Sequence, residues 1–91
     1  MNTVFILMAQ YGATAVVPIE LVCRDYFSHL NPQSLVTRIT RGDIKLPLVR
    51  MDRSQKCSKG VAITDLARYL DDQIDAGRHF YKQMHGRPFG T

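Results

Sequence analysis

The feature that most constrains this chain is a helical pattern between Pro18 and Phe27. Apolar side chains recur there at the spacing i, i+3, i+4, i+7 and i+8, on Ile19, Val22, Cys23, Tyr26 and Phe27. The charged residues of the stretch lie off that stripe, and only Leu21 breaks the pattern. This spacing predicts an amphipathic helix with one buried face. Cys23 lies on that face, so we expect it to be a small buried hydrophobe.

A second helix is predicted directly after a short break at residues 28–31. Asn31 is suited to cap a helix, and Pro32 suits the first helical position. The helix is expected to run to about Arg41 and to end at Gly42. Two helices joined by a tight turn are therefore expected.

The segment before these helices is apolar from Val4 to Ala9 and too short to span a bilayer. We interpret it as core, in a short helix over Thr3 to Tyr11 with Gly12 as its C-terminal cap, although Val4 to Ile6 also suit a strand. Residues 15–17 are expected to be extended, because a residue before proline avoids the helical region. A strand would then lead into the helix that starts at Pro18.

A β-hairpin is predicted after the second helix. Ile44 to Met51 alternates loosely and contains Pro47, which restricts it to an edge strand or a strand end. Residues 52–60 are polar and basic, and Val61 to Ile63 can return as the second strand. Next to a pair of helices, such a hairpin is typical of a wing.

The last helix is expected to begin near Thr64, as N-cap, and to continue to about His85, with residues 86–91 as a loose tail. At about 30 Å it is longer than so small a core can cover. Its inward residues follow the a/d spacing of a coiled coil, on Ala67, Leu70, Ile74, Gly77, Tyr81 and Met84. This pattern predicts a homodimer or higher oligomer; the alternative is that the helix folds back on Val4 to Tyr11 of the same chain.

Length and composition limit the possible classes of protein. With 91 residues, one domain over 1–91 is expected, made of an N-terminal segment (1–17), a helix-turn-helix and wing (18–63) and a C-terminal helix (64–85). The fold class is mainly α with a small β-hairpin, a winged helix-turn-helix similar to those of excisionases and MerR-type regulators. Two cysteines form no disulfide framework and indicate a reducing cytoplasm.

No catalytic or metal-binding pattern is found in the sequence. The three histidines have no partner at the spacing of a catalytic triad or a zinc site. We therefore expect no enzyme activity, no cofactor and no metal. Cys57 is interpreted as an inert surface thiol, with redox sensitivity as the alternative.

The second helix has the composition of a DNA-recognition helix. Leu35, Val36 and Ile39 can anchor it, while Gln33, Ser34 and Thr37 can read base edges. Arg38 can reach a guanine or a phosphate, and Arg41 a phosphate. A net charge of +4 and a pI of about 9.4 suit a polyanion. Double-stranded promoter DNA is the expected partner.

The hairpin tip supplies the remaining candidate DNA contacts. They are basic or small polar residues that can lie along phosphates, namely Arg50, Arg53, Ser54, Gln55, Lys56 and Lys59. The alternative is a solvated hairpin whose charges only confer solubility. On the last helix, Asp71, Asp72 and Asp75 form an acidic patch that would contact protein, RNA polymerase for instance, and not DNA.

Four runs of the sequence resemble the pyocin activator family of PrtN-like proteins: FILMAQYG, VVPIELVCRDYFSHL, LPLVRMDRSQK and GVAITDLARYLD. The similarity covers Asn2 to about Asp72. It implies promoter binding and transcriptional activation of bacteriocin or phage-tail gene clusters in a bacterial or prophage setting, and no enzymatic activity. Two alternatives stay open, an excisionase-like architectural DNA-binding protein and a protein-binding adaptor.

Overall fold

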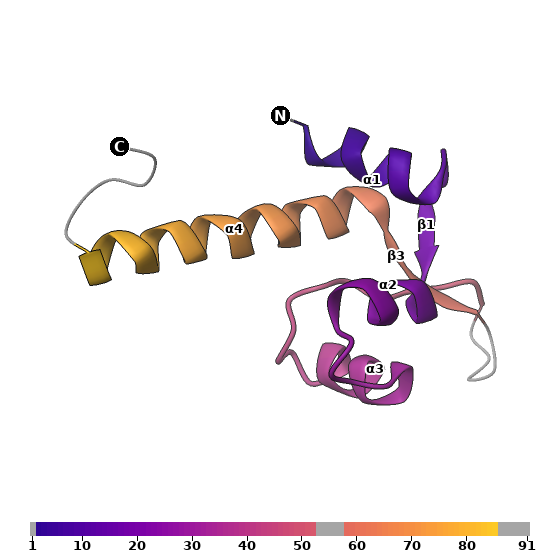
Figure 1. Ribbon diagram of the computed structural model, residues 1–91. Coiled ribbons are helices and arrows are strands. Elements are labelled where there is room, and N and C mark those ends of the chain that lie inside the picture. Colours follow the sequence, from indigo (N-terminus) through magenta and orange to yellow (C-terminus); the bar gives the residue numbers. More distant parts are fainter. Residues whose placement is uncertain (1, 53–57, 86–91) are drawn as a thin grey trace.

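The computed structural model describes residues 2–52 and 58–85, and Figure 1 shows the order of their elements. This part of the chain is mostly helical with a small antiparallel sheet, as the sequence predicted. The elements in chain order are α1 (Thr3–Tyr11), β1 (Val16–Pro18), α2 (Ile19–Tyr26), α3 (Pro32–Thr40), β2 (Val49–Arg50), β3 (Lys59–Ala62) and α4 (Ile63–His85).

The N-terminal segment is a helix and not a strand. The Asn2 side chain accepts a hydrogen bond of 2.9 Å from the amide of Val4, and Gly12, at φ 83°, ends α1 as predicted. The interpretation of Val4 to Ala9 as core is largely wrong, because only Leu7 is fully buried there. Phe5 and Ile6 are 67% and 47% exposed, since α1 packs on α4 by one side only.

The sheet has three strands in the order β1-β3-β2, all antiparallel. Gly60 is paired with Pro18 on one side and with Val49 on the other. The β2–β3 hairpin was predicted, but the pairing of β1 with β3 was not. The first hairpin strand is also shorter than predicted, because Leu46 is turned into the core, and Pro47, which has no amide hydrogen, follows it.

Helices α2 and α3 form the predicted pair with a tight turn. Pro18 ends β1 and does not open α2, so the helix begins one residue later than expected. The buried thiol of Cys23 donates to the carbonyl of Leu30 at 3.1 Å, which ties the turn to α2. Asn31 accepts a hydrogen bond of 2.8 Å from the amide of Ser34 and caps α3, as predicted. The turn is therefore held at both of its ends.

Helix α4 follows β3 without a break. Because its first residue is Ile63, Thr64 lies inside the helix, and the prediction that Thr64 is the N-cap is wrong. The amide of Ile63 donates instead to the carbonyl of Ala15 at 2.9 Å. The predicted strand end at Ile63 is likewise wrong.

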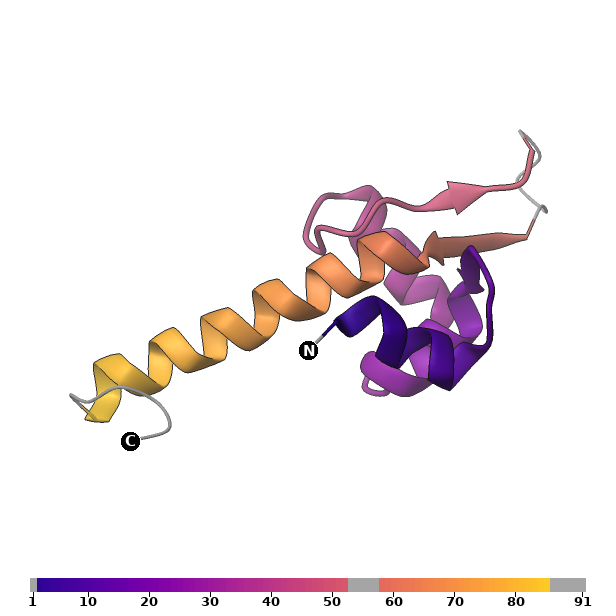
Figure 2. The ribbon, with the colours of Figure 1, turned by 90° about the horizontal axis from the view of Figure 1, so that it is seen from above.

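The core lies between the sheet, α2, α3, α1 and the first turns of α4. Its buried members are apolar: Leu7, Val17, Ile19, Val22, Cys23, Phe27, Leu35, Ile39, Leu46, Val61, Ile63, Leu66 and Ala67. Seen from above, α1 lies along the first half of α4, and the second half of α4 projects beyond the body (Figure 2). The described chain is therefore elongated, with principal extents of 50 × 29 × 18 Å.

Candidate nucleic-acid interface

Helix α3 is fixed by one face and presents the other to solvent. Leu35 is fully buried and Ile39 nearly so. Gln33, Thr37 and Arg38 are exposed, and Ser34 is half-buried near the N-terminal cap. The Thr37 hydroxyl donates to the carbonyl of Gln33 at 3.0 Å, so it lies close to the helix backbone. The structure therefore places these four predicted residues on α3 with three of them freely accessible.

The C-terminal end of α3 is closed by a backbone motif. Gly42, at φ 84°, donates its amide to Ile39, and the amide of Asp43 donates to the carbonyl of Arg38 at 2.9 Å. These two bonds form a Schellman cap, in which the glycine adopts the left-handed conformation. The cap uses the Arg38 carbonyl and leaves its guanidinium on the exposed face.

Charges on α3 are all positive. The helix sequence PQSLVTRIT contains no acid, and Arg41 follows it as the C-cap. Arg41 pairs with Asp43 at 3.3 Å, and both side chains are largely exposed, at 68% and 49%. An exposed pair of this kind contributes little to stability. Arg41 can therefore exchange this partner for a phosphate at small cost.

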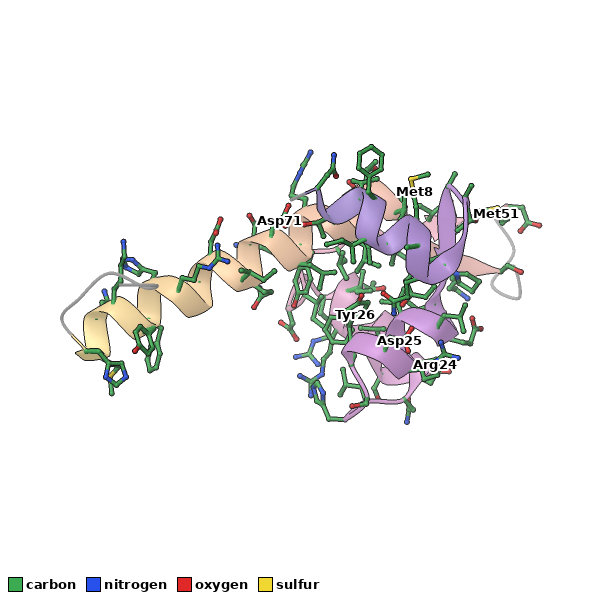
Figure 3. All side chains as sticks on the ribbon, turned by 45° about the horizontal axis from the view of Figure 1, so that its top comes forward. Met8, Arg24, Asp25, Tyr26, Met51 and Asp71 are labelled. Atoms are coloured by element: carbon green, nitrogen blue, oxygen red, sulfur yellow. The ribbon has the colours of Figure 1, made fainter. Side chains whose placement is uncertain are left out.

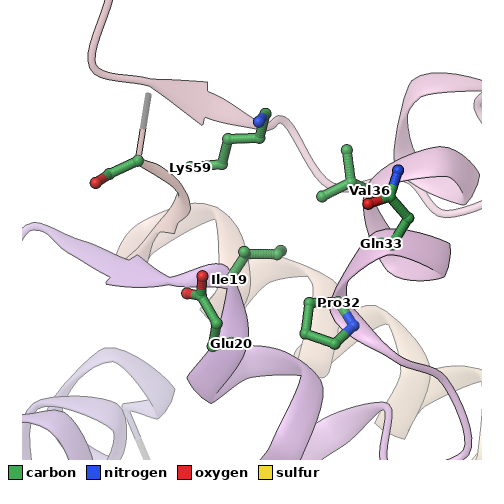
Figure 4. Close-up of a pocket in the computed structure, with 7 residues that line it drawn as sticks. Ile19, Glu20, Pro32, Gln33, Val36 and Lys59 are labelled. Atoms are coloured by element: carbon green, nitrogen blue, oxygen red, sulfur yellow. The ribbon is translucent and has the colours of Figure 1, made fainter. Parts of the chain in front are cut away.

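A cleft joins α3 to the hairpin. It has a volume of about 340 Å³ and lies between the first turns of α2 and α3 and the start of β3, lined by Ile19, Glu20, Pro32, Gln33, Val36, Ser58 and Lys59. Figure 4 shows Gln33 on one side of it and Lys59 on the other. Gln33 and Lys59 are 26 positions apart in the sequence and were predicted as separate contacts, and the fold brings them to one surface.

The base of the hairpin carries two of the predicted basic residues. Arg50 and Lys59 are directly opposed in the β2–β3 register. Opposed side chains leave an antiparallel sheet on the same face, so the two cations share one side of the hairpin. Arg50 is exposed and Lys59 half-buried. Arg53, Ser54, Gln55, Lys56 and Cys57 lie outside the described residues.

A family model described as pyocin activator protein PrtN matches residues 3–76, which is most of the chain. The chain belongs to this family. The match confirms the resemblance and identifies the chain as a member of a family of regulatory activators, which are not enzymes. Neither the curated proteins nor the solved structures gave a significant match.

In this PrtN family member, the sequence alone did not indicate Glu20 as a lining residue of the cleft. Its carboxylate lies on the α2 side of the cleft, beside Ile19 in Figure 4. The one available signal was its position in the first turn of α2, two residues after Pro18. An acid there repels phosphate, so Glu20 is not counted among the candidate DNA contacts.

A polar cluster that the sequence did not predict joins α1 to α2 (Figure 3). The Asp25 carboxylate accepts hydrogen bonds from Tyr11, Gln10 and Arg24, and Tyr26 donates to Gln10 at 2.8 Å. The hydrogen bond from Arg24, followed by that from Tyr11, lowers the pKa of Asp25 to about 2. Burial, with the bond to Asp25, raises the pKa of Tyr11. These residues have a structural role, so Arg24 is not counted among the candidate DNA contacts.

The described ranges hold no set of three histidine, cysteine, aspartate or glutamate side chains that could bind a metal. Among the same residues, no helix combines the length and apolar character needed to cross a bilayer.

Proposed function

We propose that this chain is a DNA-binding transcriptional activator of pyocin-type gene clusters and that residues 18–63 act as a winged helix-turn-helix. One observation carries the proposal: Gln33 of α3 and Lys59 of β3 flank the same cleft, so the helix and the hairpin share a surface. A recognition helix next to a wing has this arrangement. Membership of an activator family agrees with it.

In this proposal α3 lies in the major groove. Gln33, Ser34 and Thr37, near its N-terminal end, read base edges, and a glutamine can bind an adenine through two hydrogen bonds. Arg38 reaches a guanine edge or a phosphate. Arg41, at the end of the helix, neutralises a phosphate in place of its pairing with Asp43.

The hairpin acts as the wing. Arg50 and Lys59 on its base bind phosphates, and the tip residues Arg53, Ser54, Gln55 and Lys56 extend the same contact along the backbone or into the minor groove. Phosphate contacts carry no sequence information. The wing therefore contributes affinity and orientation, while α3 contributes specificity.

Titration of a fluorescent promoter duplex tests the proposal, with the duplex taken from DNase footprinting of promoters that neighbour the gene. Arg38→Ala should weaken specific binding by about 1–3 kcal/mol. Arg68→Ala removes the same charge at an exposed position of α4 and should bind like the wild type. Circular dichroism melts should superimpose for all three proteins.

Two results would contradict the proposal. One is unchanged affinity of Arg38→Ala, which would remove α3 from the interface. The other is binding that does not weaken as salt rises, because phosphate contacts release counterions. DNA binding without activation of a reporter gene would favour the architectural alternative, and bending of the duplex can then be measured by gel mobility.

A further inference from the structure

The second half of α4 leaves the body of the molecule. Ile63, Leu66 and Ala67 are buried, whereas each residue from Asp71 to His85 is exposed. Thr3, the first residue of α1, donates a hydrogen bond to Oδ1 of Asp71 and marks the limit of the contact between α1 and α4. Beyond that point α4 projects by itself (Figures 1 and 2). An isolated helix of about 15 residues is marginally stable in water.

The projecting half carries large apolar side chains on the predicted seam. Ile74, Tyr81 and Met84 are 48%, 41% and 65% exposed. They continue the a/d spacing of Ala67, which is buried, and Leu70, which packs against the core. Exposed apolar residues that line up in this way mark an interaction site, unlike scattered ones. The seam is therefore covered within the chain at Ala67, half-covered at Leu70 and uncovered from Ile74 onwards.

Gly77 lies on this seam in the interior of α4, and no contact among the described residues requires a glycine there. A Cβ atom added there would meet no other atom within 4 Å. Glycine in a helix interior is less favourable than alanine. A glycine on the seam allows another backbone or a large side chain to approach closely, which explains its presence if a second helix packs there.

The charges of the projecting half indicate which helix packs against the seam. Its acids, Asp71, Asp72 and Asp75, come first, and its cations, Arg78 and Lys82, come later. A parallel copy of the same helix would place acids level with acids and cations level with cations. An antiparallel copy brings the acidic end of one helix to the basic end of the other, and it sets Asp71 against Arg78 at the positions that flank the seam.

We propose that two copies of this chain associate through the second halves of their α4 helices, packed antiparallel about a two-fold axis. With a residues opposite d residues, Ile74 lies over Gly77 of the second copy and Leu70 over its Tyr81. Asp71, oriented by Thr3, lies opposite Arg78 of the second copy, and symmetry repeats each contact. Residues 77–85 lie outside the family match, so the contact joins matched residues such as Asp71 and Ile74 to the part of α4 beyond the match.

Sedimentation equilibrium without DNA tests the proposal. Because the interface is small, we expect a dissociation constant of about 1–100 µM, with the mass rising from the chain mass of 10.4 kDa toward twice that value. Ile74→Asp with Tyr81→Asp should stay monomeric, because association would bury unpaired charges. Ala76→Asp adds the same charge on the outward side of α4 and should associate like the wild type.

A charge reversal tests the antiparallel geometry. Asp71→Arg should raise the dissociation constant at least about tenfold. Each of the two symmetry-related contacts in the dimer would then bring one arginine against another. Adding Arg78→Asp to Asp71→Arg should restore it to within about threefold of the wild type, since the pair is re-formed with its signs exchanged. Rescue of this kind is not expected from a merely structural effect of either substitution.

Three results would overturn the proposal: a wild type that stays monomeric at about 500 µM, an Ile74→Asp/Tyr81→Asp variant that still dimerises, or a charge reversal that gives no rescue. All three are measured without DNA. Failure here would leave the proposed DNA interface untouched, and failure of DNA binding would leave the dimer untouched.

Discussion

The Tyr11 hydroxyl donates a hydrogen bond of 2.6 Å to Oδ2 of Asp25 and so joins α1 to α2. In the sequence β1 lies between these two helices, and in the fold α1 makes its main contacts with α4. The bond therefore links the helix that supports α4 to the helix pair proposed to bind DNA. Loss of this bond should lower the free energy of unfolding and leave DNA specificity unchanged, because neither residue lies on the α3 surface.

Tyr11→Phe should lower the free energy of unfolding by about 1 kcal/mol, since it removes the partly buried hydrogen bond to Asp25 and a longer, exposed one from Gln10, and keeps the ring. Urea unfolding followed by circular dichroism would measure it. Ser28→Ala, at an exposed position of the turn, serves as the control and should change little. Equal stability of Tyr11→Phe and the wild type would show that water replaces the bond without cost.

The Asp25 carboxylate should make the free energy of unfolding depend on pH in the acid range. The folded state lowers the pKa of Asp25 from 3.8 to about 2, mainly through the hydrogen bond from Arg24 and then that from Tyr11. A lowered pKa in the folded state gives stability that is fully present above the unfolded value and is lost as pH falls toward the folded value. The stability difference between wild type and Asp25→Asn should therefore shrink between about pH 4 and pH 2. A difference that stays constant across this range, measured by urea unfolding, would contradict the assignment.

Gly60 is required by the central strand for steric reasons. A Cβ atom there would lie 2.5 Å from the carbonyl oxygen of Val17 and 2.7 Å from Cγ1 of Val16. The nearest atom belongs to the backbone, so it cannot move aside without disturbing the β1–β3 pairing. Gly60→Ala should cost about 1–3 kcal/mol in thermal unfolding. Gly77→Ala, where the space is open, should not destabilise the folded monomer.

Local signals in the sequence predicted the helices well. Asn31, Pro32 and Gly42 fixed the bounds of α3 to within a residue, because caps act on the backbone next to them. Gly12 did the same for the end of α1. The anchoring of α3 through Leu35 and Ile39 also followed from periodicity alone.

Contacts between distant residues could not be predicted in this way. The pairing of Val17 with Val61 depends on how the chain folds back, and nothing in either strand encodes it. The same pairing explains the error at Thr64, because a strand that leads directly into α4 needs no side-chain cap. The cleft that brings Gln33 to Lys59 is likewise a product of tertiary packing.

The proposed interface predicts different consequences for Gln33 and Lys59, although they flank one cleft. Gln33→Ala should reduce the discrimination between the promoter site and an unrelated duplex by about 1–3 kcal/mol, since it removes a base contact. Lys59→Gln should weaken binding to both duplexes about equally and reduce the slope of log K against log salt by about 0.9, since it removes one phosphate contact. Titrations of each variant on both duplexes, at three or more salt concentrations, would measure the two effects. An unchanged salt slope for Lys59→Gln would exclude the hairpin as a wing, and equal discrimination by Gln33→Ala would exclude this residue from base reading.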